Sequence, residues 1–207
     1  MSAERRVIEG SGDMTEDLPQ QLALDLDTNF ERLVRCYQDR IYAFCLRYTG
    51  RPEDAEEIAQ DAFVSAYRAL RAYPGERIRS LALRPWLYQI ALNGCRNQAR
   101  RKHLQVVALH DETDEQPAFE PEADEREQPE RVLERGEGVR EMTNMVAALP
   151  EQYRAAVVLR HINGLGYAEA ADVLGEPVGT VKSNVHRGVR ILREAMDRSV
   201  NEGETRG

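Results

Sequence analysis

Hydrogen-bond donors and positive charges are concentrated near the C-terminus of the chain. Residues 178–193 include four Lys or Arg and no Asp or Glu, although the whole chain carries a formal net charge of -8. Lys and Arg side chains bind phosphates and guanine edges, and hydroxyl groups bind phosphates, so such a stretch suits contact with duplex DNA. The residues that would make this contact are Thr180, Lys182, Ser183, His186, Arg187 and Arg190.

The surrounding residues predict a helix-turn-helix. We expect a short helix over 168–174, a break at residues 175–177 where Gly and Pro occur, and a second helix that starts near Val178. Apolar residues recur on the other side of the second helix and would pack on the first; they are Val181, Val185, Val189 and Leu192. Such a helix fits the major groove of DNA. A basic helix that only faces solvent is the alternative interpretation.

A second group of positive charges lies in the N-terminal half. Residues 77–102 include seven Lys or Arg and no acid, whereas residues 53–61 include five acids and no base. The basic stretch suits nucleic acid and the acidic one suits a basic protein surface, although a solvated helix start explains the acids equally well. The loop 74–84, which follows Tyr73, is a candidate for contact with unstacked bases. We expect Trp86 to pack in the core.

Three predicted helices position this second group. An apolar stripe with a period near 3.6 predicts a helix over 30–48, which Gly50 ends. Pro52 begins a second helix, whose first turns carry acids where the helix dipole favours them and whose inner stripe runs through 55–70. A third helix begins at Pro85. Together they predict a compact helical unit.

Composition divides the 207-residue chain into two small domains. Residues 106–141 include thirteen acids and four Arg, a net charge of -9, so the rest of the chain sums to +1 (24 basic, 23 acidic). That segment has three Pro and few large apolar residues, which predicts a flexible linker that lets the domains sit apart on a large partner. We therefore predict an all-α fold with two small helical domains, 28–104 and 141–198, an acidic linker, 105–140, and loose tails, 1–27 and 199–207.

Other classes of protein find little support. No stretch approaches the roughly 20 apolar residues of a membrane span, and the N-terminus lacks the pattern of a signal peptide, so we expect a cytoplasmic protein. Cys36, Cys45 and Cys95 lie among apolar neighbours without a C-x-x-C pair, which predicts buried reduced thiols. The four His residues lack the spacing of metal ligands. We therefore assign no metal and no cofactor.

Four blocks of sequence carry a family resemblance. They are residues 57–63, 86–93, 149–154 and 178–183, the last followed by His186 and Arg187. In order and spacing the chain resembles the bacterial sigma factors of the extracytoplasmic-function (ECF) class of the sigma-70 family. The resemblance implies a non-enzymatic, two-domain subunit that directs RNA polymerase core to promoters. Its N-terminal domain would bind the beta-prime clamp helices and read and help open the minus ten element, and its C-terminal domain would bind the beta flap and read the minus thirty-five element.

The resemblance also assigns residues and partners. It places the residues that bind core polymerase on one helix: Glu57, Gln60 and Asp61. It places the contacts to minus ten DNA at Arg77, Arg79, Asn93, Arg96, Arg100 and Arg101, and it gives the minus thirty-five contacts to the basic helix described first. It suggests an anti-sigma factor that holds the two domains together. The loop between Tyr73 and Trp86 is a few residues longer than the family pattern.

Two other functions fit parts of the sequence. An autonomous helix-turn-helix repressor or activator would use the first domain to sense a ligand or to dimerise, because such regulators need a dimer interface for adequate affinity. That domain would have no need for a basic loop beside an acidic helix. A nuclease would need clustered carboxylates or His in a folded pocket to hold metal, whereas the acids here lie in the predicted linker or on a helix exterior.

Overall fold

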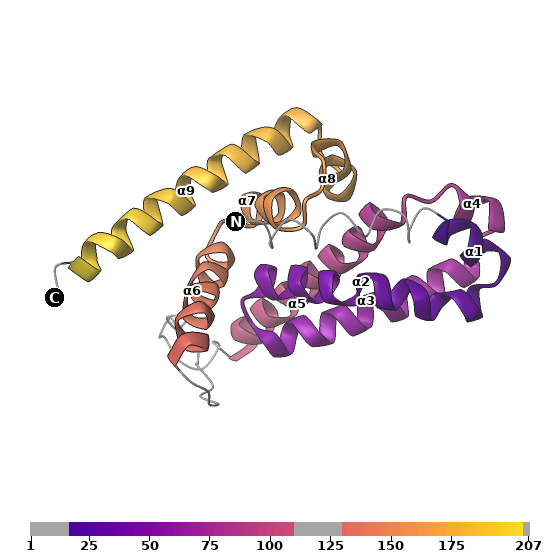
Figure 1. Cartoon of the computed structure of the whole chain (residues 1–207), viewed down its shortest axis with the longest axis horizontal. Coiled ribbons are helices and arrows are strands. Elements are labelled where there is room, and N and C mark those ends of the chain that lie inside the picture. The colour runs from indigo at the N-terminus through magenta and orange to yellow at the C-terminus, as the bar shows by residue number, and fades with distance from the viewer. Residues whose placement is uncertain (1–16, 110–129, 205–207) are drawn as a thin grey trace.

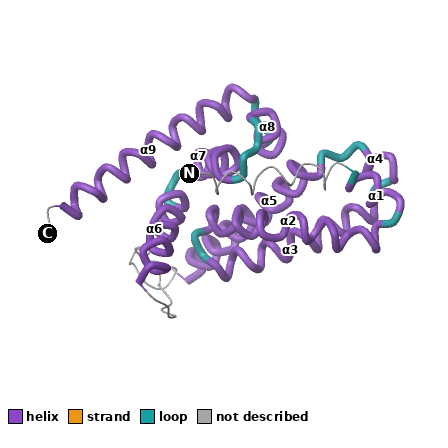
Figure 2. The backbone as a smooth tube through the Cα atoms, in the orientation of Figure 1, coloured by secondary structure: helices purple, strands orange, loops and turns teal. Residues whose placement is uncertain are grey.

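The structure is a computed structural model, and it describes residues 17–109 and 130–204 (Figure 1). Within these ranges the backbone forms helices and turns without a strand, which confirms the predicted all-α fold (Figure 2). None of these helices has both the length and the hydropathy that a bilayer span requires. In chain order they are α1 (Leu18–Leu24), α2 (Leu26–Thr49), α3 (Pro52–Ala72), α4 (Gly75–Arg79), α5 (Leu83–Leu109), α6 (Glu130–Ala147), α7 (Glu151–Val157), the π-helical turn η2 (Val158–Ile162), α8 (Tyr167–Leu174) and α9 (Val178–Glu204).

Helices α2, α3 and α5 form the body of the N-terminal half. Gly50 ends α2 in the left-handed conformation, with a φ of 73°, which Gly adopts at little cost. Pro52 lies in the first turn of α3, where its missing N–H removes no helical hydrogen bond. The rings of Phe44 and Tyr88 meet edge to face with centroids 5.4 Å apart and join α2 to α5. The predicted boundary between the first two helices is therefore confirmed.

The prediction of a loose tail through residue 27 is wrong for residues 18–24, which form α1. Leu18 and Leu22 are four residues apart, so they share one side of the helix, and both are fully buried. The seven acids in the first 27 residues give this stretch the composition of a tail. The two buried Leu side chains pack α1 against the rest of the core, and the helix contacts both α2 and α4.

Three predicted flexible boundaries also differ from the structure. Helix α5 continues to Leu109 and α6 begins at Glu130, so both ends of the predicted linker are helical. Helix α9 continues to Glu204, into the predicted C-terminal tail. Helix propagation explains these extensions, because each added residue gains one backbone hydrogen bond without a new nucleation cost. The middle of the predicted linker, 110–129, lies outside the described residues.

The C-terminal half contains the predicted helix-turn-helix. Helix α8 ends at Gly175, which has a φ of 67°, and α9 begins at Val178. The side-chain amide of Asn184 donates to Glu176 at 3.1 Å, which ties α9 to the turn. Helix α9 also crosses α7 closely: a Cβ atom at Gly188 would lie 2.5 Å from Val157 Cγ2. Only Gly allows this separation of the two helices.

The two halves pack against each other through one continuous apolar core. Helix α6 lies beside α2, and α8 lies against α5 (Figure 1). Polar groups cross the same boundary. Arg154 Nη1 donates to the Tyr48 carbonyl at 2.9 Å, and the Asn163 amide donates to the Tyr88 hydroxyl at 3.1 Å. The halves are therefore joined in this structure by specific hydrogen bonds as well as by apolar contact.

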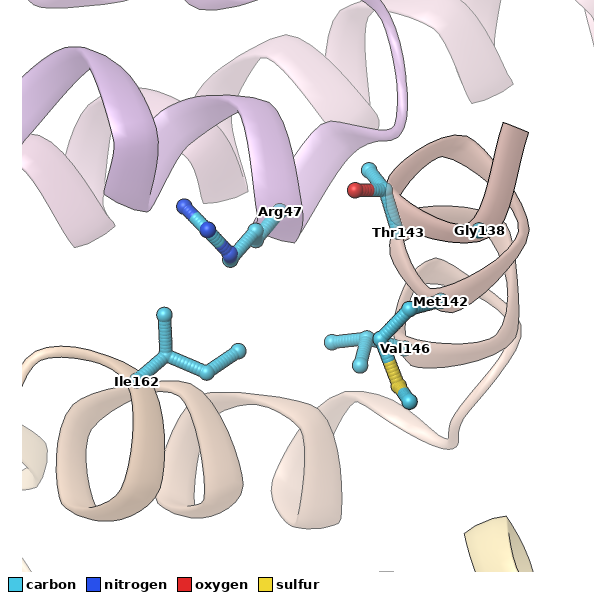
Figure 3. Close-up of a pocket in the computed structure, with 6 residues that line it drawn as sticks. All are labelled: Arg47, Gly138, Met142, Thr143, Val146 and Ile162. Carbon is cyan, nitrogen blue, oxygen red and sulfur yellow. The ribbon is translucent and has the colours of Figure 1, made fainter. Parts of the chain in front are cut away.

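A small cavity of about 130 Å³ lies where α6 meets α2 and η2 (Figure 3). Its lining consists of Arg47, Gly138, Met142, Thr143, Val146 and Ile162. Among the described residues of this lining, Arg47 carries the one charged side chain, and none is an acid or His. We therefore interpret the cavity as a gap in the packing between the halves rather than as a site for chemistry.

The cysteines are free thiols on the helices of the N-terminal half. Cys45 and Cys95 are buried, as predicted, whereas Cys36 is only half-buried. A hydrogen bond with Cys45 and burial both raise the pKa of the Cys95 thiol well above its ordinary value. The Cys95 thiol is therefore kept in the neutral form.

Candidate nucleic-acid interfaces

The six candidate residues of the C-terminal helix lie together on its outer side. Helix α9 follows Pro177, whose carbonyl accepts from the Val181 N–H at 3.1 Å. Val181 and Val185 are buried against the rest of the helix-turn-helix, which fixes the rotation of α9 about its axis. We name the opposite side the α9 face, and its exposed members are Thr180, Lys182, Ser183, His186, Arg187 and Arg190.

Neighbouring aromatic residues restrain two cations of the α9 face. Lys182 Nζ lies 5.6 Å from the centre of the Tyr167 ring on α8. Hydrogen bonds from Gln152 and Arg187 lower the pKa of the Tyr153 hydroxyl on α7. Both aromatic partners, Tyr167 and Tyr153, belong to the same half of the molecule as α9. They restrain the directions of the Lys182 and Arg187 side chains, which stay exposed. The α9 face is thus a preformed surface of donors and positive charge.

The segment predicted as a loop, 74–84, contains the five-residue helix α4. Both of its candidate residues, Arg77 and Arg79, are exposed. The Arg77 guanidinium carbon lies 3.7 Å from the centre of the Tyr73 ring, whose centroid is 6.2 Å from that of Trp86. Trp86 packs partly buried against the core, as predicted. This end of the molecule therefore presents cations beside aromatic rings, a combination that suits unstacked bases.

Helix α5 carries the other four candidate residues of the N-terminal half. Asn93, Arg96 and Arg100 are spaced by three and four residues and share one side of the helix. Asn93, Arg100 and Arg101 are exposed, whereas Arg96 Nε lies 2.9 Å from Glu151 on α7. With a rise of about 1.5 Å per residue, Arg101 lies roughly 27 Å along the axis from the start of α5. The predicted set forms an elongated track along α4 and α5, not a single cluster.

Helix α3 presents the predicted polymerase-binding residues on its outer side. Glu57, Gln60 and Asp61 are all exposed. They follow the spacing of residues that are neighbours on a helix surface. Ile58 and Ala62, on the inner side, are buried. We name the exposed set the α3 face; its two carboxylates give it negative charge.

Two segments of the chain match known family models. Residues 33–104 match Sigma-70 region 2, and residues 140–192 match Sigma-70, region 4. The chain is 32% identical over 197 residues to the ECF RNA polymerase sigma-E factor of Escherichia coli strain K12, which covers 90% of this chain and 97% of that protein. The chain belongs to the ECF class of sigma-70 factors.

Other sigma factors show the same relationship. The ECF RNA polymerase sigma factor SigE of Mycolicibacterium smegmatis is 32% identical over 176 residues, which are 84% of this chain, and the chain spans 64% of that relative's length. The sigma factor RpoE of Bartonella quintana, solved in complex with the anti-sigma factor NepR, shares the fold, with a TM-score of 0.63 and 21% identity over 82% of this chain and 97% of that one. The predicted function is confirmed: a sigma factor is a non-enzymatic subunit that directs RNA polymerase to promoters.

The matched regions leave one helix of this sigma factor unassigned. The region 2 match begins at residue 33, inside α2, and ends inside α5. The region 4 match runs from within α6 to within α9. Helix α1 precedes both matches, although two of its side chains, Leu18 and Leu22, are part of the core.

The residues that hold the parts of the sigma factor together were not predicted from the sequence. Arg84 counted among the cations suited to nucleic acid, yet its Nη2 donates to the Asn163 carbonyl at 2.6 Å. Asp54 counted among the acids suited to a protein surface, yet it binds Lys102 on α5. No spacing rule detects these pairs, because the partners are 79 and 48 residues apart in the chain.

Proposed function

We propose that this sigma factor reads the minus thirty-five element with the α9 face and binds core polymerase with the α3 face. The track along α4 and α5 reads the minus ten element and helps to open it. In this proposal residues 28–104 and 141–198 act as two units, and the acidic segment 105–140 connects them. Regulated transcription follows, because only promoters with both elements engage both units.

The α9 face is the observation that carries the proposal. Its six side chains are exposed on one side of a helix whose other side is buried. Arg187 can bind a guanine through two hydrogen bonds in the major groove, and Lys182 can bind phosphate or guanine. Thr180 and Ser183, near the helix N-terminus, suit phosphate contacts that set the position of the helix on the duplex.

Base stacking and charge support the minus ten assignment. The rings of Tyr73 and Trp86 and the guanidinium of Arg77 offer planar surfaces on which an unpaired base can stack. Arg100 and Arg101 extend the positive charge along α5 and suit the phosphate backbone. On α5 alone the candidate residues run from Asn93 to Arg101, about 12 Å along the helix axis, which matches three to four base steps at about 3.4 Å each.

Charge complementarity supports binding of the α3 face to polymerase. Glu57 and Asp61 are exposed, and nucleic acid would repel them. A basic protein surface such as the clamp helices of the beta-prime subunit accommodates both carboxylates, and opposite charge steers the encounter. The C-terminal unit binds the beta flap in the same complex.

An anti-sigma factor is a further proposed partner. The RpoE protein of Bartonella quintana was solved with the anti-sigma factor NepR, and this chain shares its fold. A partner that covers the α3 face and joins the two units would block polymerase binding. We place the sigma factor in the cytoplasm, because its proposed partners, polymerase and promoter DNA, are found there.

Run-off transcription from a promoter library tests the proposal. The purified sigma factor is mixed with bacterial core polymerase and with DNA that is randomised over both promoter elements. We expect transcripts from defined starts and enrichment of two separate sequence elements. A variant with Lys182, Arg187 and Arg190 changed to Ala should lose enrichment of the upstream element alone. The absence of a defined start with the unchanged protein would refute the proposed function.

A further inference from the structure

Helix α1 lies against the short helix α4 at one end of the N-terminal half (Figure 1). It contains three Leu residues in different surroundings. Leu18 and Leu22 are 0% and 1% exposed, whereas Leu24, at the end of the same helix, is 82% exposed. One side of α1 is therefore part of the core, although the helix has only seven residues.

Polar contacts fix α1 to the start of α2. The Asn29 side-chain amide donates to the carbonyls of Gln21 at 3.1 Å and Asp25 at 2.8 Å. The Asp25 carboxylate caps α2 by accepting from the Thr28 N–H at 3.1 Å. The Asp25 N–H donates to the Gln21 carbonyl at 3.0 Å. These bonds satisfy backbone groups at the corner between the helices, so α1 has one defined direction.

Helix α4 depends on what it packs against. A helix of five residues is not stable alone, because nucleation costs more than its few hydrogen bonds return. Its one buried residue, Ile78, points into the core, while Arg77 and Arg79 point outward. The backbones of α1 and α4 approach closely: a Cβ atom at Gly75 would lie 3.6 Å from the Ala23 carbonyl oxygen. Helix α1 thus supplies part of the surface on which α4 folds.

We propose that α1 is a positioning element for minus ten recognition. By holding α4 it directs Arg77 and Arg79 toward the promoter without contacting DNA itself. The inference rests on the proposed role of α4, and it adds a helix that lies outside the region 2 match. In this inference the segment between Tyr73 and Trp86 is supported by residues that are about 50 positions earlier in the chain.

A matched pair of Leu variants tests this role. Leu22→Ala removes the buried contact of α1, and Leu24→Ala makes the same chemical change at its exposed end. Each variant is combined with core polymerase and assayed on three promoters: matched, altered only at minus ten, and altered only at minus thirty-five. We expect Leu22→Ala to reduce discrimination at minus ten about tenfold, the scale of one lost base contact. Discrimination at minus thirty-five should stay within about twofold, and Leu24→Ala should match the unchanged protein.

Ratios between promoters separate positioning from simple loss of stability. Unfolded sigma factor transcribes no promoter, so a smaller folded fraction lowers all three signals equally and leaves both ratios unchanged. Asn29→Ala keeps both buried Leu residues and loosens only the corner, and it carries the test should Leu22→Ala fail to fold. We expect it to reduce minus ten discrimination in the same direction by a smaller factor. Unchanged minus ten discrimination in Asn29→Ala and in any folded Leu22→Ala protein would overturn the inference, whereas inactivity of the unchanged protein would instead refute the proposed function.

Discussion

The α9 face and the track on α4 and α5 use similar cations in different ways. All six residues of the α9 face are exposed, and Arg190 finds its ion-pair partner, Glu194, on the same helix at 3.7 Å. On α5, in contrast, Arg84 and Arg96 contact the other half of the molecule. A count of basic residues therefore predicts an exposed cationic surface well on a helix that packs on one side. It overestimates that surface on a helix that packs on two.

The distance between the two promoter elements limits which surfaces can contact DNA at the same time while the halves are packed together. The two promoter elements are named for positions about 25 base pairs apart, which is about 85 Å of duplex at 3.4 Å per pair. A single folded body of this length has a radius of gyration of about 17 Å. The α9 face and the track could not both reach the elements assigned to them in the proposed function while the halves are packed as described. The proposed function therefore requires that the contact between the halves opens when both elements are bound.

Replacing Arg154 by Ala weakens that contact and has the largest expected effect on stability among the changes proposed below. Arg154 donates to the carbonyls of Tyr48, in the other half, and of Leu149. Because the change leaves partly buried carbonyls without a donor, we expect the free energy of unfolding to fall by about 2–3 kcal/mol. Urea denaturation measures it, and Arg193→Ala, at an exposed position of α9, is a matched control expected to change stability by less than about 0.5 kcal/mol.

Promoter selectivity of the same variant sharpens the comparison. Since the contact opens on the promoter, Arg154→Ala should leave discrimination at both elements unchanged at temperatures where the variant is folded. A selective loss at minus thirty-five would instead show that the contact with the N-terminal half orients the α9 face.

Replacing Arg187 by Ala tests whether the α9 face reads bases. If Arg187 makes two hydrogen bonds to a guanine, promoter use should fall by about 1–3 kcal/mol, with relaxed specificity at one position of the minus thirty-five element. Binding to core polymerase should not change. Run-off transcription and a pull-down with core polymerase measure the two properties. Equal transcription by the variant and the unchanged protein would remove Arg187 from the set.

The separation of two interacting residues along the chain decides whether their contact could be predicted from the sequence. Gly50, Pro52 and Gly175 act on neighbouring residues, so helix boundaries at these positions follow from local rules. The rotation of α9 likewise follows from the spacing of its Val residues. Helix α1 could not be predicted, because it depends on two Leu side chains whose packing partners lie elsewhere in the chain. The contact between Arg84 and Asn163 depends on how two halves meet, which no local pattern encodes.

The acids of the α3 face can be tested by substitution in the same way as the cations of the α9 face. Replacing Asp61 by Arg puts a positive charge on the α3 face, and repulsion from a basic polymerase surface should lower core affinity by about tenfold or more. The fold should be unaffected, because Asp61 is exposed. Asp54→Ala is the matched comparison, since Asp54 binds Lys102 within the fold. That variant should lose stability and keep its core affinity, and undiminished core binding by Asp61→Arg would remove Asp61 from the interface.

The ion pair between Arg96 and Glu151 has the smallest expected effect on stability. It distinguishes two roles of α5, which are to join the halves and to contact minus ten DNA. Their side chains are 33% and 59% exposed, so a double-mutant cycle should give a coupling of about 0.2–1 kcal/mol in stability. Opening of the halves releases Arg96 to the basic track, and Arg96→Ala should therefore reduce transcription that depends on minus ten. Glu151→Ala should not reduce it, because that change frees Arg96 in advance. Equal losses of transcription in the two variants would mean that Arg96 acts only in joining the halves.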